Sequence, residues 1–515
     1  MLTNSVAYFA RARPAKTACI DLDTGERSSF AELDARAGRM AAALQHVTGK
    51  ADLSGERIAV LARNSSALIC LHLACRRVRA IFVPLNFRLS GAELAVLVRQ
   101  AEPLLILVHP EFDGLAADLH GGSPAARLMD FGAEGEFSRA TASMKHAPLV
   151  RPCSDDTIVT LLFTSGTSGR PKGVIVTERN AHATARNYAL SVDIDGSCVF
   201  LCDMPLFHVV GLFTIAGSVL EAGGTLLISS QFEPQATQSR IADRKLQVSH
   251  YFCVPQMAQM LRQLPGFDPA GYRRLRALQT GGAPHPAASV LAWVRERVRC
   301  VDGFGMTEAG TVLGMPPGDL AMLRHKSGSV GVPAANISVR VVDKAGRDVG
   351  TGEVGELWLR GPSITPGYWR DETATQAGFQ AGWLRTGDAA VRDEEGFFAL
   401  VDRWKDMFIS GGENVYPAEV EAALAEMAGV LEVAVIGIAD QKWGEVGSAY
   451  LVLSPRAQFA PDAVLAHCRR RLAGYKVPKE FHVVDSLPRT ASGKVRKDLL
   501  RGAGTEKCWA RSAAS

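Results

Sequence analysis

A short loop of glycines and hydroxyl residues constrains this chain more than any other feature. Residues 164–173 read Thr-Ser-Gly-Thr-Ser-Gly-Arg-Pro-Lys-Gly and directly follow the apolar run 158–163. A short apolar run predicts a buried strand, and glycines let the backbone approach a ligand closely. Backbone N–H groups and hydroxyls donate to anionic oxygens, and the cation of Lys172 suits a phosphate. We therefore expect the loop to hold a polyphosphate, while a solvated turn between two strands fits the same residues.

The loop is not a Walker A loop. That motif requires Gly-Lys-Ser/Thr four residues after its first glycine, and here the fifth residue after Gly166 is Pro171. The chain also lacks a Gly-x-Ser-x-Gly sequence, which excludes a serine hydrolase of the nucleophile-elbow type.

Composition excludes several other classes. The chain has 515 residues, more than a single core usually serves, so two or more domains are expected. With 57 basic and 53 acidic residues the net charge is only +4, which predicts no nucleic-acid partner and no anionic membrane surface. Ten cysteines without a Cys-x-x-Cys pair argue against a disulfide framework or a structural zinc site.

The sequence predicts a protein of the reducing cytoplasm. Its N-terminus has no basic segment followed by an apolar stretch, so no secretory signal is expected. The most apolar window, residues 209–220, is too short to cross a bilayer, so we expect no integral membrane segment.

The order of patterns along the chain predicts an α/β fold joined to an α+β part. Strand and helix patterns alternate through the first 330 residues, which indicates βαβ units in two lobes with largely parallel sheets. Alternating segments after Ser329 predict a small antiparallel sheet or barrel, and a compact α+β stretch starts at Pro417. We place the domain boundary near residues 402–405, where the strand pattern stops.

Three further segments suit an anionic nucleotide. Gly281, Gly282 and Ala283 end an apolar strand and leave room for a flat base. Residues 302–308 supply an aromatic face, a hydroxyl and a carboxylate, and a carboxylate beside a triphosphate needs a metal between them, so Glu308 is the candidate Mg²⁺ ligand. Asp388 can accept hydrogen bonds from both ribose hydroxyls.

The order and wording of these motifs resemble the acyl-adenylate-forming superfamily of acyl-CoA synthetases, luciferases and peptide-synthetase adenylation domains. The resemblance covers essentially the whole chain. It implies an N-terminal part of two α/β lobes and a small β-barrel over residues 1–402. It also implies a mobile α+β lid domain over residues 403–515, with the hinge near Lys405.

The resemblance also implies a role for each motif residue. Glu308 would hold the metal, Thr307 would touch the α-phosphate, Lys494 would be the catalytic lysine, and His208 would orient and gate the reactants. The resemblance further implies which residues bind phosphate, adenine and ribose, which one forms the hinge and which ones line the pantetheine passage. They are Thr164, Ser165, Gly166, Thr167, Ser168, Gly169, Lys172, Gly281, Gly282, Ala283, Asp302, Phe304, Gly305, Asp388, Arg403, Lys405, Gly411 and Gly412. Phe304 stands where the family usually has tyrosine, which keeps stacking and loses a hydroxyl.

The function implied is that of an ATP-, Mg²⁺- and CoA-dependent acyl-CoA synthetase acting on a small carboxylic acid. The segment after His208 should line the acyl pocket, with Tyr251, Phe252, Val254, Thr311 and Leu313 added from later segments. None of these is charged, so a hydrophobic monocarboxylate is expected, and fatty and aromatic acids both stay open.

Two other readings remain. An enzyme that stops at acyl-AMP or loads a carrier protein is the first alternative, and a non-catalytic nucleotide-binding scaffold is the second. The sequence is also compatible with a homodimer and with regulatory acylation of Lys494.

Overall fold

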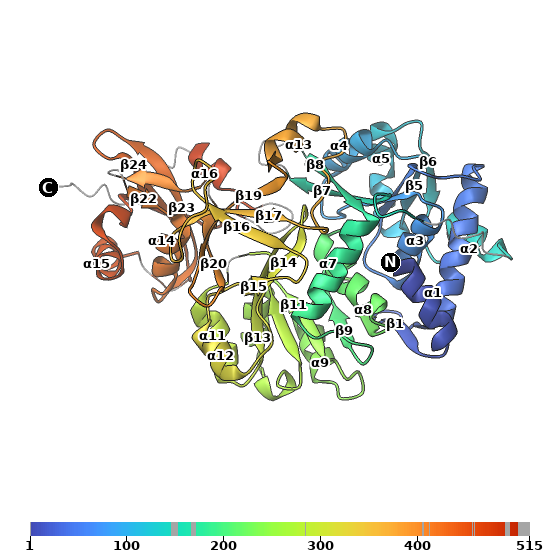
Figure 1. The fold of residues 1–515 in the computed structure, drawn as a ribbon, viewed down its shortest axis with the longest axis horizontal. Helices are drawn as coiled ribbons and strands as arrows, with labels where there is room; N and C mark the ends of the chain where they lie inside the picture. Colours follow the sequence, from blue (N-terminus) through green and yellow to red (C-terminus); the bar gives the residue numbers. More distant parts are fainter. Residues whose placement is uncertain are drawn as a thin grey trace. The chain divides into compact units, whose positions relative to one another are not determined.

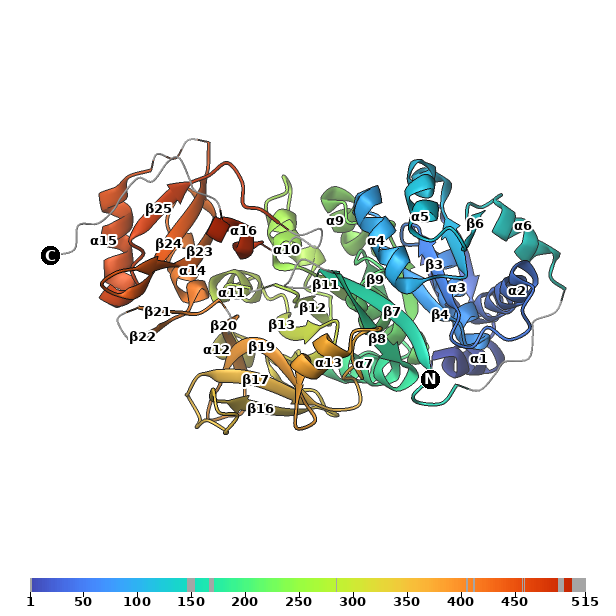
Figure 2. The same cartoon turned by 90° about the horizontal axis from the view of Figure 1, so that it is seen from above.

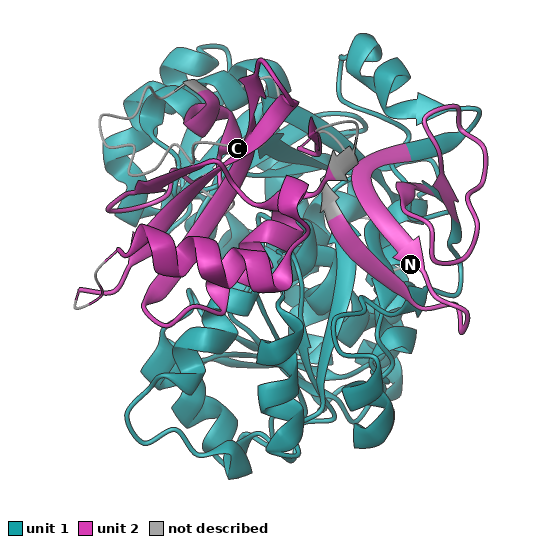
Figure 3. Cartoon of the chain, turned by 90° about the vertical axis from the view of Figure 1, so that its left-hand side faces the viewer, with its two compact units in different colours: residues 1–339, 359–384 teal, residues 340–358, 385–515 magenta. Residues whose placement is uncertain are grey.

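The computed structural model describes residues 2–145, 153–165, 171–283, 285–403, 406–410, 413–455, 457, 459–489 and 495–502. The chain forms two compact units, one of residues 1–339 and 359–384 and one of residues 340–358 and 385–515 (Figure 3). The boundary between them passes through two strands, β17 (Gly355–Arg360) and β19 (Trp383–Arg392).

A nine-stranded sheet forms the base of the first unit. Its order is β15-β14-β13-β12-β11-β9-β10-β1-β2, and the pairs from β13 to β1 are parallel. Its strands are β1 (Thr17–Asp21), β2 (Arg27–Ser29), β9 (Val199–Cys202), β10 (Thr225–Ile228), β11 (His250–Cys253), β12 (Ala277–Thr280), β13 (Cys300–Met306), β14 (Gly310–Gly314) and β15 (Val332–Pro333).

A six-stranded sheet of order β6-β5-β3-β4-β7-β8 forms the second layer of this unit. Its strands are β3 (Arg57–Leu61), β4 (Ile81–Pro84), β5 (Leu105–Val108), β6 (Arg127–Asp130), β7 (Ile158–Ser165) and β8 (Pro171–Thr177). All pairs are parallel except β7 and β8, so the glycine and hydroxyl loop joins two antiparallel strands instead of a strand and a helix.

Helices cover both sheets (Figure 1). The helices are α1 (Leu2–Ala12), α2 (Phe30–Thr48), α3 (Ser66–Arg77), α4 (Gly91–Ala101), α5 (Ala116–Gly122), α6 (Glu136–Ser143), α7 (Glu178–Ser191), α8 (Ser218–Glu221), α9 (Pro234–Ala242), α10 (Pro255–Arg262), α11 (Ala287–Arg295), α12 (Leu320–His325) and α13 (Glu372–Gly378), with the 3₁₀ turns η1 (Pro110–Leu115) and η3 (Pro269–Gly271) and the π-helix η2 (Val210–Gly217). Figure 2 shows α4 and α5 beside β3 and β4, where their apolar residues share one buried cluster with those strands.

Local sequence explains where the central helix α7 begins. Thr177 accepts a hydrogen bond from the backbone N–H of Asn180, and the Asn180 side chain accepts one from the backbone N–H of Thr177. This reciprocal capping satisfies N–H groups that the first turn leaves without helical partners. Asn180 also donates to the carbonyls of Pro362 and Ile364, which anchors a distant segment to the start of α7.

The remaining described strands form two five-stranded sheets. The first has the order β16-β17-β19-β18 with β20 paired to β19, and its remaining strands are β16 (Ser338–Val342), β18 (Phe379–Gln380) and β20 (Phe398–Arg403). The second has the order β22-β21-β24-β23 with β25 paired to β24. Its elements are β21 (Phe408–Ser410), β22 (Glu413–Val415), α14 (Pro417–Ala425), β23 (Val430–Asp440), β24 (Gly444–Leu453), α15 (Pro461–Arg471), η4 (Gly474–Lys476), β25 (Glu480–Val483) and α16 (Lys497–Gly502).

The observed elements confirm the expected fold class. Alternating βα units give way to antiparallel strands after residue 330, and a compact α+β sheet with its own buried cluster follows residue 406. Within the described ranges no helix combines the length and the apolar character that crossing a bilayer requires.

Candidate active site

The strand pair β7–β8 holds both ends of the glycine and hydroxyl loop. Thr164 pairs with Lys172, and the backbone of Ser165 pairs with that of Pro171. The pairing fixes where the loop leaves and re-enters the sheet. The expected phosphate-binding residues Gly166, Thr167, Ser168 and Gly169 lie outside the described residues.

Lys172, Tyr368 and Glu308 form a polar cluster at this edge. The Lys172 Nζ lies 4.8 Å from the centre of the Tyr368 ring. The Tyr368 hydroxyl donates to Glu308 Oε1 at 2.9 Å. Burial and the Glu308 carboxylate raise the pKa of Tyr368, so the phenol stays protonated and can donate. The Lys172 cation thus lies over the Tyr368 ring, and the Glu308 carboxylate binds the hydroxyl of the same side chain.

The segment 363–369 brings these residues together. The backbone N–H of Thr365 donates to the Glu308 carbonyl at 2.8 Å, and its hydroxyl donates to the Ile175 carbonyl of β8 at 2.6 Å. The N–H of Trp369 donates to the Gly173 carbonyl at 2.7 Å. Tyr368 and Thr365 were not among the residues predicted from the sequence, although the run Thr-Pro-Gly-Tyr-Trp, with a turn beside two large aromatics, was a usable signal.

The carboxyl ends of β12 and β13 form the expected adenine side. Thr280 pairs with Asp302, so Gly281, which follows β12, lies next to Gly303 of β13. A Cβ on Gly281 would lie 3.1 Å from the Gly303 carbonyl oxygen and 3.3 Å from Phe252. Gly282 has φ +82°. A side chain at Gly282 would be strained by the positive φ, and one at Gly281 would fit only tightly against its neighbours.

Other expected adenine residues occupy the same edge. Ala283 is exposed, Phe304 is half-buried, and Gly305 lies at a bulge between β13 and β14. A Cβ on Gly305 would lie 2.4 Å from the Gly310 carbonyl, so only glycine allows the two strands to approach here.

A buried hydrogen-bonded chain runs behind this edge. Asp302 Oδ1 lies 3.2 Å from the Thr280 hydroxyl, which lies 2.8 Å from His285 Nδ1. Burial raises the pKa of Asp302 to about 7, although hydrogen bonds from the Gly303 N–H and Thr280 favour its charged form. Burial lowers the pKa of His285 to about 4, so its ring is neutral at pH 7. Sequence analysis expected Asp302 here and missed His285.

His208 lies at the start of a helical segment that continues as η2. Its Nδ1 accepts a hydrogen bond from the Val210 N–H at 3.4 Å, and the ring is half-buried. The next residue, Val209, lines a small cavity of about 10 Å³ together with Phe213, Thr307, Glu308 and Thr365. His208 is therefore one residue from the cavity that Thr307 and Glu308 share.

The chemistry of Glu308 fits a magnesium ion. Mg²⁺ prefers oxygen ligands and is often held by one or two carboxylates plus substrate phosphates. Among the described residues no group of three or more His, Cys, Asp or Glu side chains could hold a metal alone. These residues therefore offer one carboxylate ligand, that of Glu308, and a bound Mg²⁺ would take its other ligands from the substrate phosphates and water.

The expected ribose residues belong to the second unit. Asp388 on β19 and Arg403 on β20 are register partners, so the two positions lie opposite each other. Thr386 accepts from the Asp388 N–H at 3.0 Å, and the buried carboxylate of Glu356 accepts from the Gly387 N–H at 3.3 Å and from Trp358 Nε1 at 2.9 Å. The sequence did not single out Glu356, an acid inside an apolar strand, whose carboxylate holds the backbone N–H of Gly387 just before Asp388 in β19.

Four more expected site residues lie outside the described residues: Lys405, Gly411, Gly412 and Lys494. The side chains of Ser165 and Arg403 also lie outside them.

The acyl-pocket expectation needs one correction. Tyr251 and Phe252 are neighbours on β11, and successive strand residues point to opposite faces. Phe252 lies near Tyr188 of α7, whereas the Tyr251 hydroxyl donates to Asp203 Oδ2 at 3.0 Å, and that carboxylate also binds Thr237 of α9. Tyr251 therefore does not line a pocket that Phe252 and α7 share.

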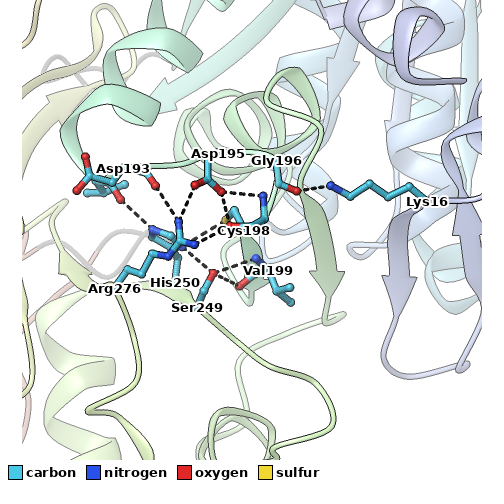
Figure 4. Close-up of polar contacts among 11 residues, drawn as sticks. Lys16, Asp193, Asp195, Gly196, Cys198, Val199, Ser249, His250 and Arg276 are labelled. Atoms are coloured by element: carbon cyan, nitrogen blue, oxygen red, sulfur yellow. Dashed lines mark hydrogen bonds and ion pairs between the residues drawn. The ribbon is translucent and has the colours of Figure 1, made fainter. Parts of the chain in front are cut away.

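A cysteine and a histidine also meet in the first unit (Figure 4). Cys198 Sγ lies 3.3 Å from His250 Nδ1, beside Ser249 and Arg276. Burial raises the pKa of Cys198 to about 12 and lowers that of His250. A thiol that stays protonated beside a neutral imidazole is a poor nucleophile. The cluster lies at the amino ends of β9, β11 and β12, away from the strand ends that carry the site, and we interpret it as structural.

Several known proteins are similar to this chain over most of its length. A family model described as AMP-binding enzyme matches residues 6–369, and a model for the AMP-binding enzyme C-terminal domain matches residues 419–494. The chain is 38% identical over 491 residues to a feruloyl-CoA synthase of an Amycolatopsis species, covering 95% of this chain and 97% of that protein. It is 33% identical over 500 residues to the long-chain-fatty-acid–CoA ligase FadD13 of Mycobacterium tuberculosis, covering 96% of each. The crystal structure of ATP-bound MatB from Rhodopseudomonas palustris is similar with a TM-score of 0.88 and 30% identity, covering 98% of this chain and 99% of that one.

Proposed function

Because the chain belongs to the AMP-binding enzyme family, we propose that it activates a hydrophobic monocarboxylic acid as acyl-AMP, releasing pyrophosphate, and then transfers the acyl group to CoA. The protein is an ATP-dependent, AMP-forming acid–thiol ligase of the acyl-CoA synthetase type. The residue roles, the acid and the lid movement below are parts of the proposal.

The cluster of Lys172, Tyr368 and Glu308 is the observation that carries the proposal. It lies at the end of the strand pair that bears the glycine and hydroxyl loop. A polyphosphate in that loop would meet the Lys172 cation on one side and the Glu308 carboxylate on the other. Glu308 would hold Mg²⁺ there, and a bound Mg²⁺ supplies neutralisation of phosphate charge.

The first half-reaction brings a carboxylate and a phosphate together, so the site must neutralise and align two anions. Lys172 would bind the β- and γ-phosphates, and the Tyr368 hydroxyl would fix the rotamer of Glu308. Thr307 would donate to the α-phosphate. His208, one residue from the cavity with Thr307, would orient the acid's carboxylate.

Residues at the ends of β12 and β13 would hold adenine, and residues on β19 and β20 would hold ribose. Asp302 would accept from the adenine amino group between Gly281 and Phe304. Asp388, beside the Arg403 position on the neighbouring strand, would accept from the ribose hydroxyls. The hinge near Lys405, the lid over residues 403–515, the pantetheine passage at Gly411 and Gly412 and the catalytic role of Lys494 stay predictions from the sequence.

The acid pocket would begin at Val209 and Phe213, which line the cavity next to Thr307. The cavity of about 10 Å³ holds little more than a water molecule. Acid binding must therefore move apolar side chains such as that of Phe213. The alternative is an enzyme that stops at acyl-AMP or loads a carrier protein. Enzymes of the family that stop at acyl-AMP carry an insertion before the ribose-binding acid, and the short segment from Gly361 to Asp388 has no such insertion, which disfavours this alternative.

The test is a panel of fatty and aromatic acids incubated with ATP, Mg²⁺ and CoA. We expect acyl-CoA, detected by mass spectrometry, together with stoichiometric AMP and pyrophosphate. Acyl-AMP without acyl-CoA across the panel would favour the alternative. ATP binding without acid-dependent pyrophosphate release would favour a non-catalytic scaffold.

Cytoplasmic location, a homodimer and regulatory acylation of Lys494 remain proposals that rest on the sequence.

A further inference from the structure

One asparagine joins the two sheets of the first unit at the turn that precedes His208. Asn64 lies just after β3 of the six-stranded sheet, and its side chain is buried. Its Nδ2 donates to the Met204 carbonyl at 2.9 Å and to the Ser229 carbonyl at 3.1 Å, and its Oδ1 accepts from the Leu206 N–H at 2.8 Å. These partners follow β9 and β10 of the nine-stranded sheet. Both N–H donors and the oxygen of the amide are therefore in use.

The Asn64 side chain does not cap the helix that follows it. Ser65 is the N-cap of α3, and its hydroxyl accepts from the Leu68 N–H at 3.2 Å. Asparagine often bonds backbone groups close to it in sequence. Here every hydrogen-bond partner of the side chain within the described residues lies at least 140 positions away along the chain. Asn64 therefore serves a contact between distant segments.

The turn before His208 depends on these bonds. Met204 and Leu206 are buried, and Pro205 between them has no N–H. A buried backbone group needs a hydrogen-bond partner, so loss of the Asn64 amide would force the turn to rearrange until the Leu206 N–H finds another acceptor. The His208 N–H donates to the Pro205 carbonyl at 3.1 Å. A rearranged turn would therefore carry His208 with it.

A movement of this turn would also reach the cavity of the candidate active site. A Cβ on Gly211 would lie 2.2 Å from the Pro205 carbonyl oxygen, so the helical segment that follows His208 packs directly on the turn. The same segment carries Phe213, which lines the cavity. Asn64 itself is not among the described residues that line it. Its influence on the cavity must therefore pass through the turn.

An aromatic contact holds the end of the same turn. Phe207, the residue before His208, meets the ring of Phe87 edge-on, with 5.3 Å between the ring centres. Phe87 follows β4, and the Arg63 guanidinium lies over its ring at 5.0 Å. Arg63 Nη1 also donates to Gln231 Oε1 at 2.8 Å, beyond the end of β10. The segments after β3 and β4 thus hold the turn at two points.

From these contacts we propose that Asn64 is a positioning residue for adenylation, because it holds the turn that places His208 beside the reacting carboxylate. The inference rests on the proposed function, which assigns this orienting role to His208. Asn64 does not touch the reactants. Its loss should therefore impair the use of the acid and spare the binding of ATP, whose phosphates and metal would be held by Lys172 and Glu308.

The experiment measures acid-dependent pyrophosphate release with cinnamate, dodecanoate and the other acids of the panel, and continues with the acid that the wild type uses fastest. In Asn64→Ala, kcat/KM for the acid should fall about 10–100-fold, because a displacement of about 1 Å can cost about 10²-fold in rate. The KM for ATP should stay unchanged. On a His208→Ala background the same substitution should cause no further loss, since Asn64 acts through His208.

Arg77→Met is the matched control. Arg77 is also buried, lies on α3 and donates to the Asp34 carbonyl at 2.8 Å. Its substitution removes a buried polar contact away from the turn, so it should lower the melting temperature and leave kcat and both KM values unchanged. The control separates a general loss of stability from a displaced His208.

The inference is overturned by an unchanged kcat/KM for the acid in Asn64→Ala, by an equal rise of the acid and ATP KM values, or by a further loss on the His208→Ala background. If Asn64→Ala does not fold, as judged by its melting curve, Asn64→Ser makes the same comparison, because one O–H cannot donate to both carbonyls. Failure of the proposed function itself is distinct: in that case the wild type releases pyrophosphate with no acid of the panel.

Discussion

At the scale of single residues, burial decides which groups carry charge. Asp302 is buried at the expected adenine edge, and burial raises its pKa to about 7, well above the ordinary value of an aspartate. Tyr368 is held protonated and so donates to Glu308. Cys198 is held as a thiol beside His250. Burial therefore reinforces the protonated form that both groups already favour at neutral pH, and it makes the Cys198 thiol a poor nucleophile.

Asp302→Asn should change how stability depends on pH. The folded pKa exceeds the unfolded one, so the folded protein binds more protons between about pH 4 and 7. The wild type therefore loses free energy of unfolding across that window, by up to about 4 kcal/mol at 1.36 kcal/mol per unit. The asparagine variant lacks this loss and should gain stability relative to the wild type as the pH rises from 5 to 8.

Denaturant melts of the nucleotide-free protein at pH 5 and pH 8 measure this difference. His285 titrates in the opposite sense, because its pKa is lowered, so the comparison between variant and wild type isolates Asp302. Asp268→Asn, on an exposed acid, is the control and should show the wild-type pH dependence. Identical pH profiles for Asp302→Asn and the wild type would contradict the argument.

At the scale of elements, one ion pair joins α3 to the first residue of α7. Arg76 Nη2 and Glu178 Oε1 are 2.5 Å apart, and both side chains are 1% exposed. Burying two charges is costly, and the pair stabilises the contact only while both partners remain. This helix contact matters for the candidate site, because α7 also carries Asn180 and Thr184.

Glu178→Ala should therefore lower the free energy of unfolding by about 3–5 kcal/mol, since it leaves the Arg76 charge buried without a partner. The double variant Arg76→Met, Glu178→Met removes both charges and should be clearly more stable than Glu178→Ala. Urea melting followed by tryptophan fluorescence measures both variants. A double variant as unstable as the single one would show that packing, not charge, dominates this contact.

At the scale of the whole molecule, the proposed reaction has two half-reactions that use different residues. The described residues of the first unit include Lys172, Glu308 and Asp302, whereas Asp388 and Arg403 belong to the second. Lys494 lies near the end of the chain, outside the described residues. We propose that the lid carries Lys494 toward the nucleotide during adenylation and away from it during transfer to CoA. This is the simplest way for the two half-reactions to use different residues.

Lys494→Ala should lower acid-dependent pyrophosphate release by about 10²–10³-fold, because it removes a cation from the transferring phosphate. The variant should still convert supplied acyl-AMP and CoA to acyl-CoA. Chromatography of both half-reactions checks the two rates. Lys442→Ala, on an exposed lysine of the second unit, should leave them unchanged. Equal loss of both half-reactions in Lys494→Ala would argue against a lid with two positions.

The sequence predicted those parts of the fold that depend on local patterns. The strand β17 (Gly355–Arg360) begins and ends where its alternation predicts, and helix α15 (Pro461–Arg471) begins at its proline. The site residues that were not predicted from the sequence are brought into place by contacts between distant segments. The turn and aromatics at residues 365–369 draw attention to Tyr368, but nothing in the neighbouring sequence indicates that its partner is Glu308.

Short-range information alone therefore determined the family and the alternation of strands and helices, because periodicity, glycine positions and motif wording are properties of neighbouring residues. Only the tertiary structure decided that Lys172, Tyr368 and Glu308 form one cluster and that Tyr251 faces away from Phe252. Those outcomes follow from burial and strand register, which bring together residues separated by up to 196 positions in the chain.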